Sequence, residues 1–241
     1  MLLAIPWNVV AGEQTIKFGG GYKYINAASH NNKLHSGRYF ELGYGYTFGN
    51  KTKNHFQFQV SNSNKEVLYE IPYVSANTNL DIYQEFNFPF YKNGKFINYS
   101  GFYFGNSFDL NFFPIVDRKN FIWENHLISG LSFRNLYQLS IKSSISLNIQ
   151  IPIYSFAFSN SLNRFDGARP QTNLSLWESM DHKIGFSDQL FKPNFEIGYL
   201  NNIIRKVKVG VFYQTRCNWY ERQNGIRTNS IAHVISLRII Y

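Results

Sequence analysis

The chain has 241 residues, of which 44% are hydrophobic, 18% are aromatic and only 16% are charged, with a formal net charge of +9. No stretch of about 18 residues is free of charged and strongly polar side chains, which excludes a transmembrane helix. The single cysteine, Cys217, excludes an internal disulfide framework and a thiol-based metal site. The basic residues are scattered rather than clustered, so we expect no nucleic-acid partner.

The first residues differ in pattern from the rest of the chain. An apolar run extends from Leu2 to Ala11, and Val9 with Ala11 fits the small-residue pattern that precedes a secretory cleavage site, although no basic residue precedes the run. We interpret residues 1–12 as the remnant of a signal peptide and residues 13–241 as one domain. An ordinary N-terminal strand is the alternative.

Ten segments of this domain alternate apolar and polar residues with a period of two, which is the pattern of a β-strand. Phe40 and Leu42, for example, alternate with Glu41 and Gly43. In the segment 97–108 aromatic residues occupy both odd and even positions, so the sequence does not decide which of its two faces points outward. In chain order the segments are 15–24, 39–49, 55–61, 79–90, 97–108, 126–139, 145–156, 193–200, 206–220 and 230–241.

The composition of the polar face indicates which face is buried. In a soluble sandwich or lipocalin the polar face meets water and is rich in Lys, Glu and Thr. Here the polar face carries Ser, Asn, Gln and several glycines, which suit a crowded interior: Gly19, Gly21, Gly43, Gly45, Gly198 and Gly210. A transmembrane barrel turns its apolar face to lipid on strands of about 9 to 11 residues. We therefore predict an all-β fold, a single antiparallel transmembrane β-barrel of about ten strands, with eight to twelve possible.

The connections between the segments alternate in length. Long polar stretches fall at 28–36, 64–78, 111–120, 159–190 and 221–229, and tight ones at 50–54, 91–95, 140–144 and 202–205. Outer-membrane barrels have short periplasmic turns and longer extracellular loops. The long stretches follow the odd strands, which predicts that both termini are periplasmic.

The end of the chain, residues 230–241, resembles the C-terminal assembly signal of Gram-negative outer-membrane β-barrel proteins. Its alternating apolar residues end in a terminal aromatic, as in Ile235, Leu237, Ile239 and Tyr241. The resemblance implies a place in the cell outer membrane, contact with outer-membrane lipid and lipopolysaccharide, and recognition by the barrel-assembly machinery during biogenesis. It extends over residues 14–241 and identifies a class of protein rather than an activity.

Charged residues on the polar face are the candidate functional residues of the lumen. The basic ones fall on the first, ninth and tenth strands, which become neighbours when a barrel closes, and the acidic ones face them. Two interpretations remain open: an ion-pair network that fills a narrow barrel, or a weakly anion-preferring pore or site for an acidic solute. The residues are Lys17, Lys23, Glu41, Asp81, Glu85, Glu196, Lys206, Lys208, Arg216 and Arg238.

Two possible catalytic groupings are weak. His126 and Ser129 resemble the His/Ser pair of lipid A deacylases, but residues three apart on a strand point to opposite faces. The stretch 159–190 contains residues that could mimic the Asp/His site of omptin proteases, although a second acidic pair is missing: Asp166, Glu178, Asp181 and His182. We predict no catalytic residue, no metal and no cofactor.

Taken together, the pattern favours a non-enzymatic outer-membrane barrel. We expect a structural or accessory barrel, or a narrow pore, whose stretch 159–190 contacts a protein partner or a glycan. The alternatives are an outer-membrane hydrolase, of the deacylase or omptin type, and a soluble lipocalin-like carrier.

Overall fold

The computed structural model of the chain describes residues 12–27, 34–49, 52–67, 75–112, 121–160, 180–186, 190–204, 207–221 and 227–241. In these ranges every regular element is a β-strand, and no helix in them is long and apolar enough to cross a membrane. The strands are β1 (Glu13–Ala27), β2 (Leu34–Phe48), β3 (Lys53–Val67), β4 (Ser75–Asn93), β5 (Phe96–Phe112), β6 (Phe121–Gln138), β7 (Ser143–Asn160), β8 (Met180–Phe186), β9 (Leu190–Phe191), β10 (Asn194–Ile204), β11 (Val207–Glu221) and β12 (Arg227–Ile240).

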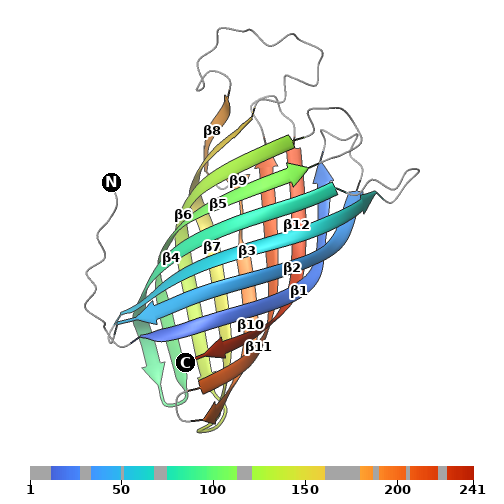
Figure 1. The fold of residues 1–241 in the computed structure, drawn as a ribbon. Helices are drawn as coiled ribbons and strands as arrows, with labels where there is room; N and C mark the ends of the chain where they lie inside the picture. The colour runs from blue at the N-terminus through green and yellow to red at the C-terminus, as the bar shows by residue number, and fades with distance from the viewer. Residues whose placement is uncertain are drawn as a thin grey trace, which may run out of the picture.

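The strands form a closed antiparallel barrel (Figure 1). Neighbours in the sequence pair with one another from β1 to β7, and the ring closes where β12 pairs with β1 and β10 pairs with β7. Three short strands share one wall position, because β8 and β10 both pair with β7 while β9 and β10 both pair with β11. The wall therefore has ten strand positions, which confirms the predicted ten-stranded antiparallel barrel.

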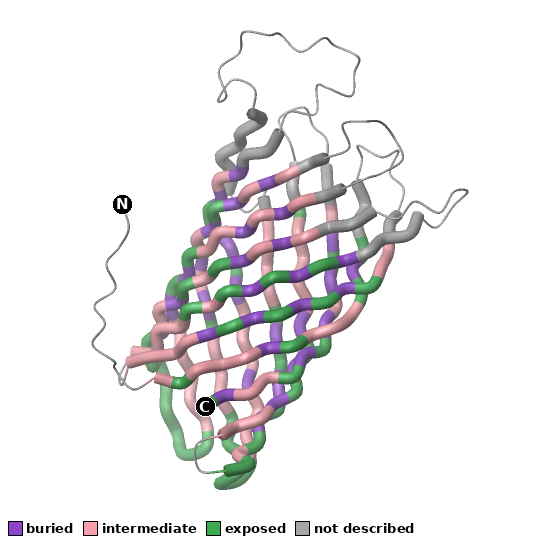
Figure 2. The backbone as a smooth tube through the Cα atoms, in the orientation of Figure 1, coloured by how far each residue is buried: buried purple, intermediate pink, exposed green. Residues whose placement is uncertain are grey.

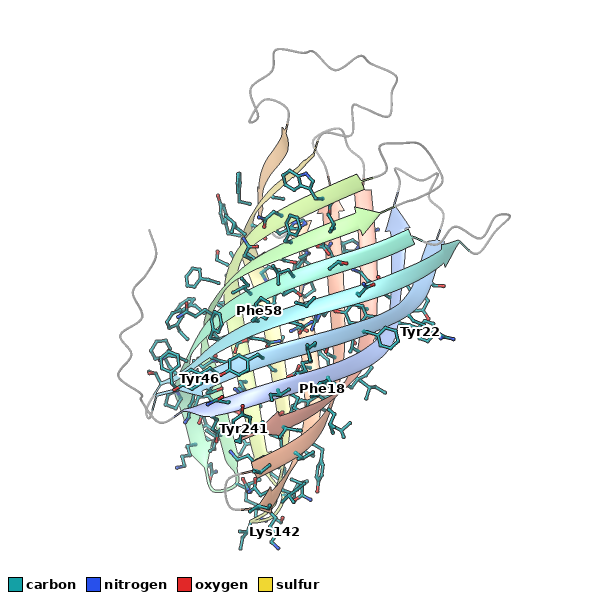
Figure 3. All side chains as sticks on the ribbon, viewed as in Figure 1. Phe18, Tyr22, Tyr46, Phe58, Lys142 and Tyr241 are labelled. Atoms are coloured by element: carbon teal, nitrogen blue, oxygen red, sulfur yellow. The ribbon has the colours of Figure 1, made fainter. Side chains whose placement is uncertain are left out.

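Buried and exposed residues alternate along most of the wall (Figure 2), with a break in β7, where the consecutive residues Ile153 and Tyr154 are both exposed. The outward faces are apolar: Phe18 is 50% exposed and Leu42 is 55% exposed. The inward faces are polar and buried, with Lys17 at 3% and Glu41 at 6% exposure. Figure 3 shows Phe18, Tyr22 and Phe58 on the outside of the wall. A polar inside and an apolar outside fit a barrel surrounded by lipid, and they contradict the lipocalin-like carrier, whose interior would be apolar.

The strands are longer than their alternating segments suggested. β4 has 19 residues, although only residues 79–90 show the pattern. The ladder between β3 and β4 continues through the pairs Ser61–Asn79 and Ser63–Asn77 to Lys65–Ser75, in a part of both strands where most residues are polar. Backbone pairing needs no apolar face, so it extends past the part of the strand that side-chain periodicity can reveal.

The orientation of the segment 97–108, left open by its sequence, is settled by the packing inside the barrel. Tyr103 points inward and is 1% exposed, whereas Phe102 and Phe104 point outward and are each 55% exposed. The Tyr103 ring lies over Gly130 of β6, where a Cβ atom would be 2.7 Å from the ring. A glycine on the next strand thus makes room for one large aromatic side chain in the lumen.

Both described ends of the chain lie at the end of the barrel that carries the tight turns. The backbone of Gln14 exchanges two hydrogen bonds with that of Tyr241, at 2.8 and 2.9 Å. Residues 94–95 and 139–142 turn at the same end, where Figure 3 shows Lys142. The strand ends that border residues 28–33, 68–74, 113–120, 161–179 and 222–226 lie at the opposite end, called the loop end below (Figure 1).

Two adjacent glycines of β1 provide a test of the wall geometry. A Cβ atom on Gly21 would overlap the carbonyl oxygen of His233 on β12, whereas the nearest heavy atom to a Cβ on Gly20 is 3.8 Å away. We expect Gly21→Ala to lower the free energy of unfolding by about 2 kcal/mol or more, because two backbones must separate. Urea unfolding in detergent micelles, followed by heat-modifiable gel migration, measures the loss. Gly20→Ala is the matched control, and equal stability of the two variants would contradict the described β1–β12 contact.

Candidate functional site: the polar lumen

An arginine on β11 organises the middle of the lumen. The guanidinium of Arg216 donates from Nη2 to Glu41 Oε2 at 2.9 Å and from Nη1 to Asp81 Oδ2 at 3.3 Å. It also donates to the Tyr39 hydroxyl at 3.0 Å and to the Gln59 side-chain oxygen at 2.7 Å. These partners lie on β2, β3 and β4, so a single side chain connects β11 with three strands across the lumen.

Lys17 on β1 completes this arrangement. Its Nζ lies 2.6 Å from Glu41 Oε1 and donates to the side-chain oxygens of Gln214 at 2.7 Å and Gln59 at 3.3 Å. Two cations therefore meet two carboxylates, with amides between them, in a space from which water is largely excluded. We call the set the central layer; its members are Lys17, Tyr39, Glu41, Gln59, Asp81, Gln214 and Arg216.

Amide side chains extend the hydrogen-bond network of the central layer to the strands on the other side of the lumen. Gln214 donates to Asn194 at 2.8 Å, and Asn194 donates to Gln150 at 2.8 Å. Gln150 in turn donates to Glu85 of β4. The chain of bonds runs from β11 through β10 and β7 to β4, so polar side chains cross the lumen in both directions.

Further ion pairs lie on both sides of the central layer. Toward the loop end, Asp109 of β5 accepts from Lys192 at 3.0 Å and lies 4.0 Å from Lys23. Toward the turn end, the two terminal nitrogens of the Arg238 guanidinium, Nη1 and Nη2, donate to the carboxylate of Glu196. The guanidinium carbon of Arg238 lies 4.0 Å from the centre of the Phe212 ring.

At the rim of the turn end, Lys208 pairs with Glu13 at 2.5 Å. Their side chains are 38% and 53% exposed. This is therefore a solvated pair, unlike the buried pairs of the central layer.

The structure places the predicted lumen residues as follows. All except Lys206, which lies outside the described residues, belong to the inward series of their strands. The cations of β1, β11 and β12 are neighbours, yet they do not form an unpaired basic wall, because each has an acidic partner. Their positions are, in chain order, Lys17, Lys23, Glu41, Asp81, Glu85, Glu196, Lys208, Arg216 and Arg238.

Several lumen residues were missed by sequence reasoning. Asp109 lies one residue beyond the segment 97–108, whose parity was open. Lys192 lies just before the segment 193–200. Gln59 and Gln214 lie on the polar faces of their strands, but a search limited to charged residues does not select neutral amides. Their position in the inward-facing series of each strand was the signal that could have identified them.

The suggested catalytic pairs do not assemble among the described residues. His126 is fully buried in the lumen, with its Nε2 3.5 Å from Glu124 Oε2, whereas Ser129 belongs to the outward series with Leu127. Asp166 and Glu178 lie outside the described residues, as do the side chains of Asp181 and His182. Where the chain is described, no group of three His, Cys, Asp or Glu residues is placed to hold a metal ion.

The terminal strand has the lipid-facing arrangement that its alternation suggests. Ile235 is 62% exposed, Leu237 is 44% exposed and Tyr241 is 46% exposed, and Ile239 belongs to the same outward series. Recognition of this strand by an assembly machinery stays a prediction.

Two small cavities flank the central layer. The outer cavity, of about 70 Å³, lies toward the loop end and includes Lys23, Asn79, Asp109 and Lys192 in its lining. The inner cavity, of about 50 Å³, lies toward the turn end and includes Glu13, His55, Glu196 and Arg238. The central layer supplies residues to both cavities and separates them.

The fold is similar to that of solved outer-membrane proteins. The outer membrane protease OmpT from Escherichia coli matches with a TM-score of 0.57 at 5% identity, over 97% of this chain and 97% of that chain. The translocator domain of the autotransporter NalP from Neisseria meningitidis matches with a TM-score of 0.52 at 8% identity, over 98% of this chain and 90% of that one. No protein-family model and no curated protein sequence matches the chain. At these identities the likeness concerns the fold, which is that of Gram-negative outer-membrane β-barrels.

Removal of Arg216 tests the energetic weight of the central layer. We expect Arg216→Ala to lower the free energy of unfolding by about 3–5 kcal/mol, because Glu41 and Asp81 stay buried without their shared cation. Urea unfolding in micelles measures the change. Lys208→Ala, at the exposed rim pair, is the control and should cost less than about 1 kcal/mol. Similar losses in the two variants would show that the central layer does not stabilise the barrel.

Proposed function

We propose that the protein is a non-enzymatic structural or accessory barrel of the outer membrane, with a closed lumen, whose loop end contacts a protein partner or a surface glycan. The stretch 159–190 is the longest connection and the main candidate for that contact. The observation that carries the proposal is the central layer, in which ion pairs and amides from five wall strands meet across the lumen.

The dimensions of the lumen support a closed barrel. Eight strands leave space for side chains alone and sixteen leave an aqueous channel, so ten strands give a narrow interior. A water molecule needs roughly 10–15 Å³ of such space, so the cavities of about 70 and 50 Å³ hold roughly five to seven and three to five waters. A hydrated ion would have to displace the side chains between them.

The energy of the ion pairs opposes spontaneous opening. While the side chains of Gln59 and Gln214 fill the space beside Arg216, a passage through the central layer requires Arg216 to leave Glu41 and Asp81. Breaking a buried pair costs about 3–5 kcal/mol, which holds an open state to roughly 1% or less of the population. A transport role would need a stimulus that supplies this energy.

The surroundings of Ser107, the serine opposite His126 in the β5–β6 ladder, support a non-enzymatic role. Ser107 of β5 is the ladder partner of His126, and its hydroxyl oxygen accepts hydrogen bonds from Lys192 at 3.0 Å and from Asn79 at 3.3 Å. A serine nucleophile attacks through an oxygen lone pair, and here both lone pairs already accept a hydrogen bond. This arrangement suits a structural hydroxyl.

Planar-bilayer recording tests the proposed closed lumen. We expect the refolded protein to show no stable conductance steps. The double variant Gln59→Ala/Gln214→Ala removes the amides that fill the central layer but keeps the pairs of Glu41 with Lys17 and Arg216, so it should give steps. Gln84→Ala, an exposed glutamine on the outward face of β4, is the matched control and should stay silent. Stable conductance in the unmodified protein would overturn the proposal.

A further inference from the structure

The outer cavity has a polar lining drawn from many strands. Asp81 and Arg216 of the central layer form its floor, Asn79 and Asp109 line it from β4 and β5, and Lys192 projects from the residues before β10. The cavity lies on the loop side of the central layer, so a solute would reach it from that end. In the proposed closed barrel the floor makes this cavity a dead end.

Three buried side-chain carbonyl or carboxylate oxygens on residues that line this cavity lack a hydrogen-bond donor among the described residues. They are Oδ1 of Asp81, of Asn79 and of Asn218. The Asp81 and Asn79 side chains are otherwise engaged, because Asp81 Oδ2 accepts from Arg216 and the Asn79 amide donates to Asp109 at 2.6 Å. Leaving a buried acceptor unpaired costs about 1–3 kcal/mol, so three of them around one cavity require an occupant that donates hydrogen bonds.

The charges around the cavity restrict the kind of donor. Three cations, Lys23, Lys192 and Arg216, surround it with two carboxylates, Asp81 and Asp109. A cationic occupant would meet a net positive lining. An anionic occupant would bring more acceptors to a place where the acceptors are already in excess. A neutral molecule with several hydroxyl groups satisfies both conditions, because a hydroxyl donates to the free oxygens and accepts from the lysines.

We propose that the outer cavity binds a small neutral polyhydroxylated molecule, either a single sugar ring or a short polyol. The volume of about 70 Å³ corresponds to about five to seven water sites, which is close to the number of polar groups on one sugar ring. The site lies inside the wall, apart from any contact made by the stretch 159–190. The proposed sugar site depends on the closed-barrel proposal in one respect, which is that the central layer forms the floor of the outer cavity.

Ligand-observed NMR tests the proposal on the full chain, refolded in a detergent without a sugar headgroup. The neutral probes are glucose, galactose and glycerol, and the charged analogues are glucosamine and glucuronate. We expect at least one neutral probe to bind saturably, and both charged analogues to bind at least about fivefold more weakly than glucose. Asn218→Leu should weaken the neutral probe about fivefold or more, since it removes one free acceptor.

A matched variant in the inner cavity controls for indirect effects. Asn148 also has a buried, unpaired Oδ1, and it lines the inner cavity, so Asn148→Leu should leave binding unchanged. Heat-modifiable gel migration verifies that both variants are folded. The proposal is overturned if no neutral probe saturates, if a charged analogue binds more tightly than glucose, or if the two leucine variants weaken binding equally. If the protein binds glucose but also conducts ions in the bilayer, the closed-lumen proposal is overturned and the sugar site stands. If the protein shows no conductance and binds no sugar, the sugar site is overturned and the closed-lumen proposal stands.

Discussion

Closure of the backbone ladder is the constraint on which the whole structure depends. Lipid offers no hydrogen bonds to a bare strand edge, so a sheet can span a membrane only as a closed ring. The ladder from Thr15–Ile240 to Ala27–Thr228 joins the first strand to the last and removes both edges. Once the ring is closed, each residue must face either lipid or lumen, because successive side chains on a strand point to opposite sides.

The lumen then has to accommodate every polar side chain that the alternation turns inward. Glycines on the polar face make this possible: a Cβ on Gly19 would lie 2.5 Å from Glu41, and one on Gly198 would overlap the Phe212 ring. Long side chains therefore lie flat over glycines of the neighbouring strand and reach the barrel axis. The formal net charge of +9 does not become a basic wall, since charges in a confined interior are tolerated only with partners.

Sequence periodicity reveals the part of this fold that is local to each strand. It predicted ten strands and the direction of the faces of all but one, the segment 97–108, because both follow from alternation within one strand. It could not give the pairing of Arg216 with Asp81, which lie 135 residues apart, since that contact depends on the tilt and stagger of the strands. The division of one wall position among β8, β9 and β10 was equally hidden, because only β10 falls in a predicted alternating segment, 193–200, and no such segment covers β8 or β9.

The height of the central layer accounts for the proposed closure of the lumen at that level. Its members Lys17, Glu41 and Asp81 alternate along their strands with outward residues of the apolar belt, namely Phe18, Leu42 and Ile82. Hydrocarbon outside and protein within lower the effective dielectric constant at this level, so each ion pair is stronger than it would be near either mouth. The pair of Lys208 with Glu13 at the rim is half exposed and correspondingly weak. In the proposed closed barrel the barrier lies at mid-membrane, and the outer cavity at the loop end, with its unpaired oxygens, is the proposed recognition site.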